Sequence, residues 1–269
     1  MSFSRTYDEA EPQRVNRWLA QAGVCSRREA EALIASGQVF IDGQQVQDVG
    51  RKIEPGQTLT LGEAGGARLD SNLSVIFHKP VGIVSSQPDP GQIPAVRLLT
   101  RENLSGNPLM KDGVAVIPDR DSKLAPCGRL DMDSRGLLIL SEDGVLAKAL
   151  IGPESQLEKE YIVRVIGEIT AKKIKELSHG MWLDDRPLKP AEVRSVADNT
   201  LRFVLHEGRN RQIRRMCELV GLAVRDLFRV RIGPLWLGDL PEGRWRMITP
   251  EERTALIDGA AGKLKIPAP

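Results

Sequence analysis

The sequence predicts an α+β protein with a small α-α-β domain followed by a larger domain of many strands and a few helices. The chain has 269 residues, which is enough for one or two domains with a substantial core. In the larger part, predicted strands and helices do not alternate strictly, which favours an α+β fold over a doubly wound one. Hydrophobic residues make up 41% and charged residues 28%, a composition typical of globular domains.

A glycine-containing stretch separates the two predicted domains. It holds Gly62, Gly65 and Gly66, and Leu69 is its one bulky apolar residue before Asp70. Such a composition is typical of a flexible linker. The expected boundaries are therefore 13–61 for the small domain, 62–72 for the linker, 73–258 for the larger domain and 259–269 for a tail.

Two helices and a small sheet account for the small domain. Val15, Trp18 and Leu19 share one face of a predicted helix. Ser26 and Glu29 have the spacing of a capping box, which predicts the start of a second helix. The remaining expectations are strands within 39–46 and 51–61 and a loose segment at 1–12.

In the larger domain, apolar runs and alternating patterns predict most of the elements. Asp143 is expected to cap a helix, and a proline followed by two glutamates at 250–252 is expected to start the last one. The other expected helices lie at 170–177 and 210–220, and the expected strands lie at 74–77, 137–140, 161–165, 191–196, 201–206, 224–230 and 245–248. Residues 87–126 predict a long loop with a short helix near 96–99, and a loop of that length is usually functional or disordered.

Charge is distributed unevenly along the chain, although the net charge is only +2. Residues 1–70 hold eight basic and ten acidic residues, whereas residues 201–231 hold eight arginines and three acidic residues. The second segment can form a phosphate-binding face or simply a solvated helix face. The use of arginine alone favours bidentate recognition of phosphate or carboxylate.

Several classes of protein are not expected from this sequence. No stretch reaches the roughly 18 consecutive apolar residues of a membrane span, and the first ten residues lack the apolar region of a signal peptide. Three scattered cysteines argue for a reducing cytosol rather than a disulfide framework. The P-loop, dinucleotide-binding and zinc-protease motifs are absent, and the three histidines are far apart, so we expect no metal or nucleotide cofactor.

The densest motif is the segment GRLDMDSRG at 128–136, which comes before a strongly apolar strand. Asp131 and Asp133 lie in its loop, where carboxylates suit a nucleophile, a base or a metal ligand. Ordinary turn chemistry is the alternative, because aspartate, serine and glycine all favour such loops. An aspartate pair at this spacing can also bind magnesium, which leaves a phosphoryl-transfer enzyme open.

A second motif, EGRNRQIRRMCE at 207–218, predicts an amphipathic helix with several arginines. At about 100° per residue, Arg211 and Arg215 point away from the apolar face that contains Ile213. Arg214 lies at the boundary of that face, where it can reach into a cleft and hold a carboxylate. The alternative is that its stem merely covers apolar surface.

These motifs resemble the RsuA/RluB/RluE/RluF family of bacterial pseudouridine synthases. GRLDMDSRGLLILSEDG resembles the catalytic motif of the family, FHKPVGIVSS its first motif, LEKEYIVRV its tyrosine motif and EGRNRQIRRMCELVG its arginine motif. The wording RNRQIRRMCE is most similar to the RluF subgroup, and residues 14–61 resemble a ribosomal-protein-S4-type RNA-binding domain. The resemblance covers almost the whole chain, in the expected order, although the 87–126 segment is longer than is usual in the family.

The resemblance implies a fold, a reaction and a set of catalytic residues. The larger domain is expected to have the pseudouridine synthase fold, a mixed and largely antiparallel sheet with flanking helices. Asp131 matches the catalytic aspartate, Tyr161 the tyrosine that lies against the target base, and Arg214 the basic residue that pairs with the aspartate. Arg129 matches the arginine that displaces or holds the flipped nucleotide, and Asp133 is expected to be structural. Without the resemblance, Tyr161 is more simply a core residue of a strand.

The resemblance also implies RNA as the partner. We expect a cytoplasmic monomer that modifies a uridine in large-subunit ribosomal RNA, with transfer RNA as a second candidate substrate, and that needs no cofactor or membrane. Further RNA contacts are expected from the basic residues Lys79, Arg209, Arg211, Arg215, Arg14, Arg17, Arg27 and Arg28.

Two alternative functions remain open at the level of the sequence. One is a non-catalytic RNA-binding or ribosome-assembly factor, against which the complete set of Asp131, Tyr161 and Arg214 argues. The other is the magnesium-dependent phosphoryl-transfer enzyme, which would use Asp131 and Asp133 as metal ligands.

Overall fold

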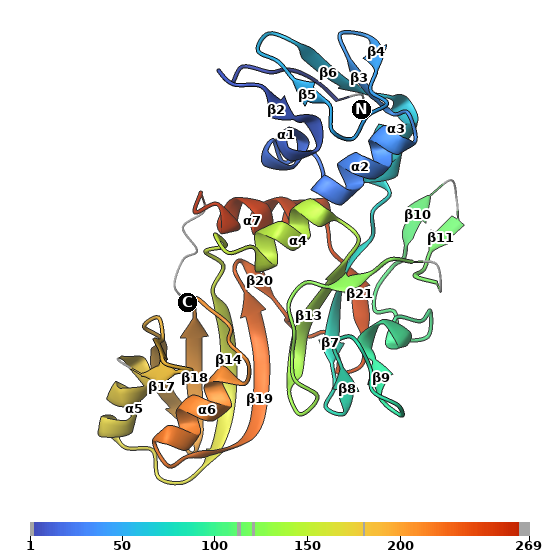
Figure 1. Cartoon of the computed structure of the whole chain (residues 1–269). Helices are drawn as coiled ribbons and strands as arrows, with labels where there is room; N and C mark the ends of the chain where they lie inside the picture. The colour runs from blue at the N-terminus through green and yellow to red at the C-terminus, as the bar shows by residue number, and fades with distance from the viewer. Residues whose placement is uncertain (1–2, 112–113, 120–121, 180, 264–269) are drawn as a thin grey trace. The chain divides into compact units, whose positions relative to one another are not determined.

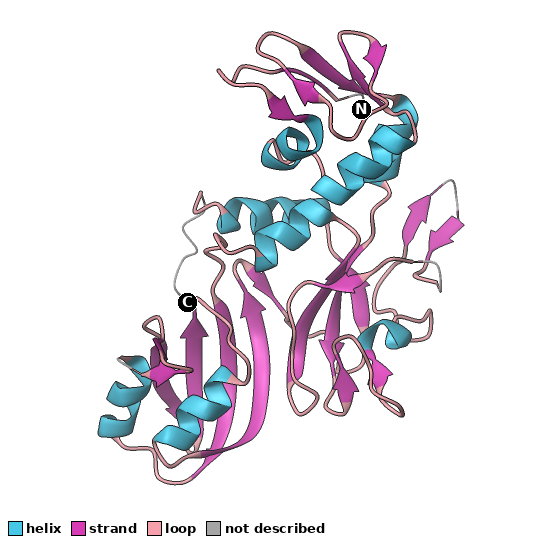
Figure 2. Cartoon of the chain, in the orientation of Figure 1, coloured by secondary structure: helices cyan, strands magenta, loops and turns pink. Residues whose placement is uncertain are grey.

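The computed structural model of the chain describes residues 3–111, 114–119, 122–179 and 181–263 (Figure 1). Two compact units are present, the first formed by Met1–Leu73 with Ser141–Lys148 and the second by Ser74–Leu140 with Ala149–Pro269. Both units combine helices with strands (Figure 2), which confirms the predicted α+β class.

The first unit contains the two predicted helices, α1 and α2, with a small sheet, and a third helix, α3, that was not predicted. A four-stranded sheet has the order β1-β6-β3-β4, and β2 pairs with β5. The elements from its N-terminus are β1 Ser4–Thr6, β2 Gln13–Arg14, α1 Val15–Gln21, α2 Arg27–Ala35, β3 Val39–Ile41, β4 Gln44–Gln45, β5 Lys52–Ile53, β6 Thr58–Leu61 and α3 Glu63–Asp70.

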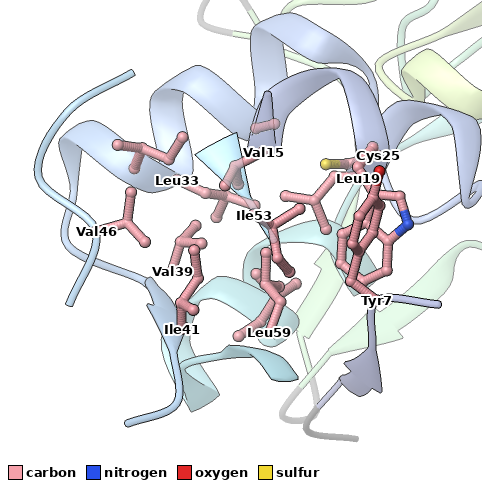
Figure 3. Packing of buried hydrophobic residues seen from close by; sticks show 14 residues of the cluster. Tyr7, Val15, Leu19, Cys25, Leu33, Val39, Ile41, Val46, Ile53 and Leu59 are labelled. Atoms are coloured by element: carbon pink, nitrogen blue, oxygen red, sulfur yellow. The ribbon is translucent and has the colours of Figure 1, made fainter. Parts of the chain in front are cut away.

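Local interactions fix the start of α2, and a shared core joins it to α1. The Ser26 hydroxyl accepts a hydrogen bond from the Glu29 amide while the Glu29 carboxylate accepts one from the Ser26 amide, so the predicted capping box is confirmed. Leu19 and Leu33 are buried together with residues of β3, β5 and β6 (Figure 3). The burial of this apolar cluster holds the small sheet and its helices together.

The prediction of a loose N-terminal segment was wrong. β1 pairs antiparallel with β6, and Tyr7 is only 1% exposed. Its ring packs edge-on against Trp18 with 5.5 Å between ring centroids, and its hydroxyl donates to the Glu11 carbonyl. Tertiary burial of one aromatic residue therefore orders a segment whose composition is polar.

The predicted linker is also helical in part. α3 covers residues that we expected to be flexible, and Gly65 and Gly66 are buried in it. A Cβ atom at Gly65 would lie 2.9 Å from the Gln38 Cβ and 3.3 Å from Leu33, so the absence of a side chain lets the helix approach its neighbours. The glycines that suggested flexibility instead allow close packing.

The second unit is built around one large sheet. From residue 74 onward the elements of the chain are β7 Ser74–Lys79, β8 Ile83–Val84, β9 Ile93–Pro94, a 3-10 turn at Ala95–Leu98, β10 Leu109–Lys111, β11 Val114–Val116, β12 Ala125–Pro126, β13 Arg135–Ser141, α4 Gly144–Ile151, β14 Lys159–Ile166, α5 Ala171–Ser178, β15 Trp182–Leu183, β16 Arg186–Pro187, β17 Glu192–Ala197, β18 Thr200–Leu205, α6 Gln212–Leu219, β19 Ala223–Ile232, β20 Leu235–Trp236, β21 Trp245–Met247 and α7 Pro250–Ala260. Most of α4 belongs to the first unit. The main path of the sheet is β17-β18-β14-β19-β13-β7-β21, with β12 beside β13 and β20 beside β19.

Pairing in this sheet is mixed and largely antiparallel, as the resemblance implied. β14 pairs antiparallel with both β18 and β19, and β7 pairs antiparallel with β21. The β13–β19 pair is parallel. α5 packs against β17 and α6 against β19 (Figure 1). The residues of β7 and β13 are almost completely buried, and β14 and β18 contribute further buried apolar residues to the core.

The 87–126 segment is less irregular than predicted. It contains β9, the 3-10 turn near the expected short helix, and the β10–β11 hairpin. The Trp245 indole donates to the Thr100 carbonyl at 2.7 Å, and the Ser105 amide donates to the Trp245 carbonyl at 2.8 Å. These bonds attach part of the segment to β21.

At the C-terminus, α7 begins with a second capping box between Thr249 and Glu252, which confirms the predicted helix start. α7 continues to Ala260, past the predicted boundary at 258/259. The expected tail beyond Lys263 lies outside the described residues. Among the residues that the structure describes, no helix is both long and apolar enough to span a membrane.

Candidate active site

The Asp131 loop is held in place by the segment that follows β7. The Ser85 hydroxyl donates to the Leu130 carbonyl at 2.7 Å and accepts from the Leu130 amide at 2.9 Å. The Gly82 amide donates to the Met132 carbonyl at 2.8 Å. Backbone positions on both sides of Asp131 are therefore fixed by the first motif, which explains why the two motifs occur together.

Lys79 supports this arrangement from inside the protein. Its side chain is fully buried, and its Nζ donates to the Pro80 carbonyl at 2.8 Å and to the Ile83 carbonyl at 2.6 Å. Burial lowers the pKa of Lys79 to about 8, although the negative charges of Asp131 and Asp133 oppose the shift. The expectation that Lys79 contacts RNA was wrong, because its amine faces the backbone of the supporting loop.

Gly136 lets the strand after the Asp131 loop approach β19. Its φ is +113°, and a Cβ atom there would lie 2.3 Å from the Arg229 carbonyl oxygen. A side chain at this position would collide with the neighbouring backbone. The close approach of β13 to β19 thus explains why glycine is the last residue of the aspartate motif.

Arg211 is the arginine nearest to the Asp131 carboxylate among the ion pairs of the described residues. Its Nη1 lies 3.5 Å from the Asp131 Oδ2. It also donates two hydrogen bonds to the Asp133 carboxylate, at 2.9 and 3.2 Å. Its backbone is left-handed, with φ 48° and ψ 32°, at the residue that precedes α6. This conformation costs energy in a non-glycine residue, and such strain is concentrated at functional sites.

Arg214 holds the backbone of the loop, not the Asp131 carboxylate. Its Nη2 donates to the Asp133 carbonyl at 2.7 Å and to the Ser134 hydroxyl at 3.2 Å, and it lies 3.3 Å from the Asp133 Oδ1. The predicted Arg214–Asp131 ion pair was therefore wrong for this structure. Arg211 is 44% exposed, as its predicted place on the outer face implies, but its guanidinium also reaches the two aspartates, which the sequence did not predict. The side chain of Arg214 is 14% exposed, which agrees with its predicted place at the edge of the apolar face.

Asp133 acts as an anchor for both arginines. Burial alone would raise the pKa of the Asp133 carboxyl, but hydrogen bonding to Arg211 and the charge of Arg214 outweigh it and lower the pKa below its usual value. This carboxylate is occupied by guanidinium groups, as its expected structural role requires. Such an arrangement also disfavours the magnesium site that the aspartate pair left open.

Tyr161 reaches the same region from β14. Its side chain is 7% exposed, and it pairs across the sheet with Arg229 of β19. Arg229 in turn pairs with Gly136 of β13, so β19 joins the tyrosine strand to the aspartate strand. The Arg229 guanidinium lies 6.0 Å from the Tyr161 ring centroid and donates to the Leu137 carbonyl at 2.7 Å.

A cavity of about 820 Å³ in the second unit collects these side chains. Six residues predicted from the sequence line it, namely Arg129, Asp131, Tyr161, Arg209, Arg211 and Arg214. Its wall therefore carries the partly exposed Asp131 carboxylate, the Glu207 carboxylate paired with Arg209, one aromatic hydroxyl and several cations. Such a site is suited to a ligand that has both an aromatic ring and a phosphate.

The cavity also contains basic residues that sequence reasoning missed, namely Lys159, Lys189 and Arg229. Burial, followed by the charges of Arg229 and Lys189, lowers the pKa of Lys159 to about 8. The alternation of Leu227 and Arg229 along one buried face of β19 was the available sign, since a buried arginine in a strand is rare.

The other predicted RNA-binding arginines divide into two groups. In the first group, Arg209 and Arg215 bind the β15–β16 hairpin of this protein. Arg209 donates hydrogen bonds to three carbonyls of the hairpin, and Arg215 forms an ion pair with Asp184. The second group lies in the first unit. Its side chains are exposed and form no ion pair with any other described residue; its members are Arg14, Arg17, Arg27 and Arg28.

Comparison with known proteins identifies the family to which the chain belongs. A family model described as RNA pseudouridylate synthase matches residues 73–219, and an S4 domain model matches residues 13–59. A solved structure described as a pseudouridylate synthase has a TM-score of 0.61 at 24% identity and covers 90% of this chain and 99% of its own, which supports the fold.

Three relatives show how far the similarity extends. The dual-specificity RNA pseudouridine synthase RluF of Escherichia coli K12 is 33% identical, over 94% of this chain and 82% of its own. An uncharacterised RNA pseudouridine synthase of Aquifex aeolicus is 34% identical, over 91% and 93% respectively. The ribosomal large subunit pseudouridine synthase B of Yersinia pestis is 36% identical, over 87% and 71%. The resemblance to the RsuA/RluB/RluE/RluF family is thereby confirmed: the chain belongs to the RNA pseudouridylate synthase family and is an isomerase that acts on RNA.

Proposed function

We propose that Asp131 is the catalytic carboxylate of this enzyme. The observation that supports it is the position of the Asp131 carboxylate, which lines the cavity beside Tyr161 and Arg129 while its side chain stays 31% exposed. The neighbouring Asp133 carboxylate is already bound by Arg211. Of the two aspartates in the motif, Asp131 is thus the one available to a substrate.

The isomerisation of uridine requires a group that acts on the ribose and a path for one proton. The bond between C1′ and N1 of uridine breaks, the uracil turns, a bond forms between C1′ and C5, and the proton leaving C5 is balanced by one gained at N1. Asp131 acts on the ribose, as nucleophile at C1′ or as base at C2′. Arg211, 3.5 Å from its carboxylate, compensates the negative charge in a partly buried site.

Tyr161 and Arg129 are assigned to the base. Tyr161 places an aromatic ring and a hydroxyl at the cavity wall, where it contacts the uracil and takes part in the proton transfer at C5. Arg129 is exposed and lines the cavity, where it helps displace or hold the flipped nucleotide. Extruding a base costs a few kcal/mol, least in a loop or bulge, so structured RNA with unpaired nucleotides is the expected substrate.

The substrate we assign is large-subunit ribosomal RNA, with transfer RNA as a second substrate. Support comes from two relatives, one named for the ribosomal large subunit and one named as dual-specificity. We further assign a cytoplasmic monomer that works without a metal or nucleotide cofactor. The cytoplasmic assignment is supported by Cys25 and Cys217, which are buried free thiols and not disulfide partners.

Mapping of pseudouridines tests this function. Ribosomal RNA and transfer RNA from cells with and without the protein are compared, and the purified enzyme is then added to RNA from the deficient cells. A uridine that is converted only in its presence, with full activity in excess chelator, supports the proposal. A protein that binds this RNA without any turnover would instead be an RNA-binding or assembly factor. Loss of activity in chelator would restore the metal-dependent alternative.

A further inference from the structure

The β15–β16 hairpin, residues 182–187, is a rigid projection next to the catalytic cavity. Its turn residues Asp184 and Asp185 both have left-handed backbones, with φ of 55° and 56°. This is the geometry of a tight two-residue turn, which matches the twist of the paired strands. Leu183 is 5% exposed and Leu188, just after the hairpin, is 8% exposed, so apolar burial fixes its base.

Two arginines of the α6 segment brace this hairpin. Arg209 donates to the carbonyls of Leu183 at 2.9 Å, Arg186 at 3.3 Å and Pro187 at 2.5 Å. Arg215 forms two hydrogen bonds with the Asp184 carboxylate, at 2.7 and 2.9 Å. Charged hydrogen bonds of this kind are among the stronger ones in proteins. The arginines that the sequence assigned to RNA therefore hold a piece of the protein in a fixed place.

The braced hairpin presents an exposed tryptophan. Trp182 is 62% exposed, whereas Trp18 and Trp245 are buried. Trp236 is 44% exposed, but the Arg231 guanidinium covers its ring at 5.4 Å. Among the described residues, no aromatic ring or guanidinium stacks on Trp182. An immobilised aromatic surface facing water is a feature of recognition sites more than of cores.

Trp182 is linked to the catalytic cavity through Arg209 and through its neighbours along the chain. Arg209 lines the cavity and bonds to the carbonyl of Leu183, the residue next to Trp182. Lys189, two residues beyond the hairpin, also lines the cavity. Arg186 is exposed, and the charge of Asp184 is neutralised by Arg215. Cations at the cavity and an uncovered indole ring are thus held together by one braced hairpin.

From these contacts we infer that Trp182 is a stacking platform for one unpaired base that flanks the target uridine. The inference rests on the proposed function, because it presumes that a uridine enters the cavity. Single-stranded bases are commonly recognised by stacking on aromatic side chains. The platform gives the enzyme a contact to the neighbouring nucleotide that is independent of the chemistry at Asp131, and so contributes to the choice of target.

The test uses the full-length protein and a stem–loop transcript of large-subunit ribosomal RNA that contains the uridine converted by the wild type. In a series of transcripts, one nucleotide at a time is made abasic, at each of the two positions before and the two positions after that uridine. The Kd is measured for the wild type, Trp182→Ala, Trp182→Phe and the control Trp236→Ala. Because stacking one base on an aromatic side chain contributes 1–3 kcal/mol, Trp182→Ala should raise the Kd by about 5- to 150-fold. Trp182→Phe should recover most of the loss, and Trp236→Ala should bind as the wild type does.

The decisive outcome is energetic coupling between the Trp182 substitution and the loss of one base from the RNA. At one flanking position, the abasic nucleotide should weaken binding to the wild type but not weaken Trp182→Ala further. The wild-type half of this comparison does not depend on the folding of any variant. If no position shows coupling, the inference is wrong even when the uridine is converted, whereas failure of conversion by the wild type removes the proposed function itself. An effect of Trp182→Ala seen only on ribosomal particles, and not on protein-free RNA, would assign the surface to a protein and also overturn the inference.

Discussion

The guanidinium of Arg211 bridges the two aspartates of the catalytic loop, 3.5 Å from the Asp131 carboxylate and hydrogen-bonded twice to Asp133. The Asp133 carboxylate therefore anchors the Arg211 guanidinium, while the Asp131 carboxylate stays at the cavity wall. This division of roles, together with the loop contacts of Arg214 and Lys79, leads to three predictions, and the exposed arginines of the first unit lead to a fourth.

Asp131→Asn should abolish turnover, because an amide is neither a nucleophile at C1′ nor a base at C2′. Its RNA affinity should stay within about threefold of the wild type, since the contacts to phosphate are retained. Single-turnover assays and binding curves measure the two effects separately. Asp133→Asn is the matched control and should keep measurable activity. Complete loss of activity in Asp133→Asn, or substantial turnover by Asp131→Asn, would reverse the assignment.

Arg214→Ala should lower the single-turnover rate at saturating enzyme by about 100-fold. The reason is positional: Arg214 donates to the Asp133 carbonyl and the Ser134 hydroxyl, and a loop displaced by about 1 Å loses about this much. Arg214→Lys should recover only part of the rate, because one ammonium does not reproduce the guanidinium fork. Arg215→Ala, which instead releases Asp184 in the hairpin, should affect binding more than the rate. Equal behaviour of Arg214→Ala and Arg215→Ala would show that Arg214 does not position the loop.

The stability of the protein should depend on Lys79 in alkaline solution. Its pKa is about 8 in the folded protein, against an ordinary lysine value of 10.5 in the unfolded chain, so the unfolded chain binds more protons between these values. Folded Lys79 therefore carries a penalty below about pH 8 that is relieved as the pH rises toward 10.5.

Lys79→Met removes this titration. Thermal or urea unfolding from pH 7 to 10 should show the wild type gaining stability relative to Lys79→Met only above about pH 8. The contribution of Lys159, which titrates in the same range, cancels in this difference. A difference between the two proteins that is constant across the range would mean that the amine is not held in a dry site.

The exposed arginines of the first unit should contribute salt-dependent RNA binding. Replacing Arg27 with glutamine removes one phosphate contact, so the slope of log K against log salt should become shallower by about 0.7–0.9. Arg14, Arg17 and Arg28 should each behave in the same way. Lys172 on α5, 87% exposed, serves as a control for charge alone, and Lys172→Gln should leave the slope unchanged. Equal slopes for the arginine variants and the wild type would exclude these residues from the RNA interface.

Much of the fold was determined by local sequence. Strong periodicity and end signals, such as the Ser26–Glu29 capping box and the Asp143 cap, act over a few residues and were read correctly. The two misjudged segments show the limit of this approach. β1 and α3 are ordered by burial of Tyr7 and by the close approach of Gly65 to its neighbours, and both depend on residues distant in the chain.

The sequence by itself determined which motifs meet in the site, because the order of the aspartate, tyrosine and arginine motifs and the residues that they contain identify the family. Only the tertiary structure decided which arginine faces which aspartate. Helical periodicity applies only inside a helix, and α6 begins at Gln212, so the left-handed backbone of Arg211 redirects its side chain across the loop to Asp131 and Asp133. Arg214, in the first turn of the helix, instead holds the loop backbone. The direction of each long side chain depends on the three-dimensional positions of both partners and not on their spacing along the chain.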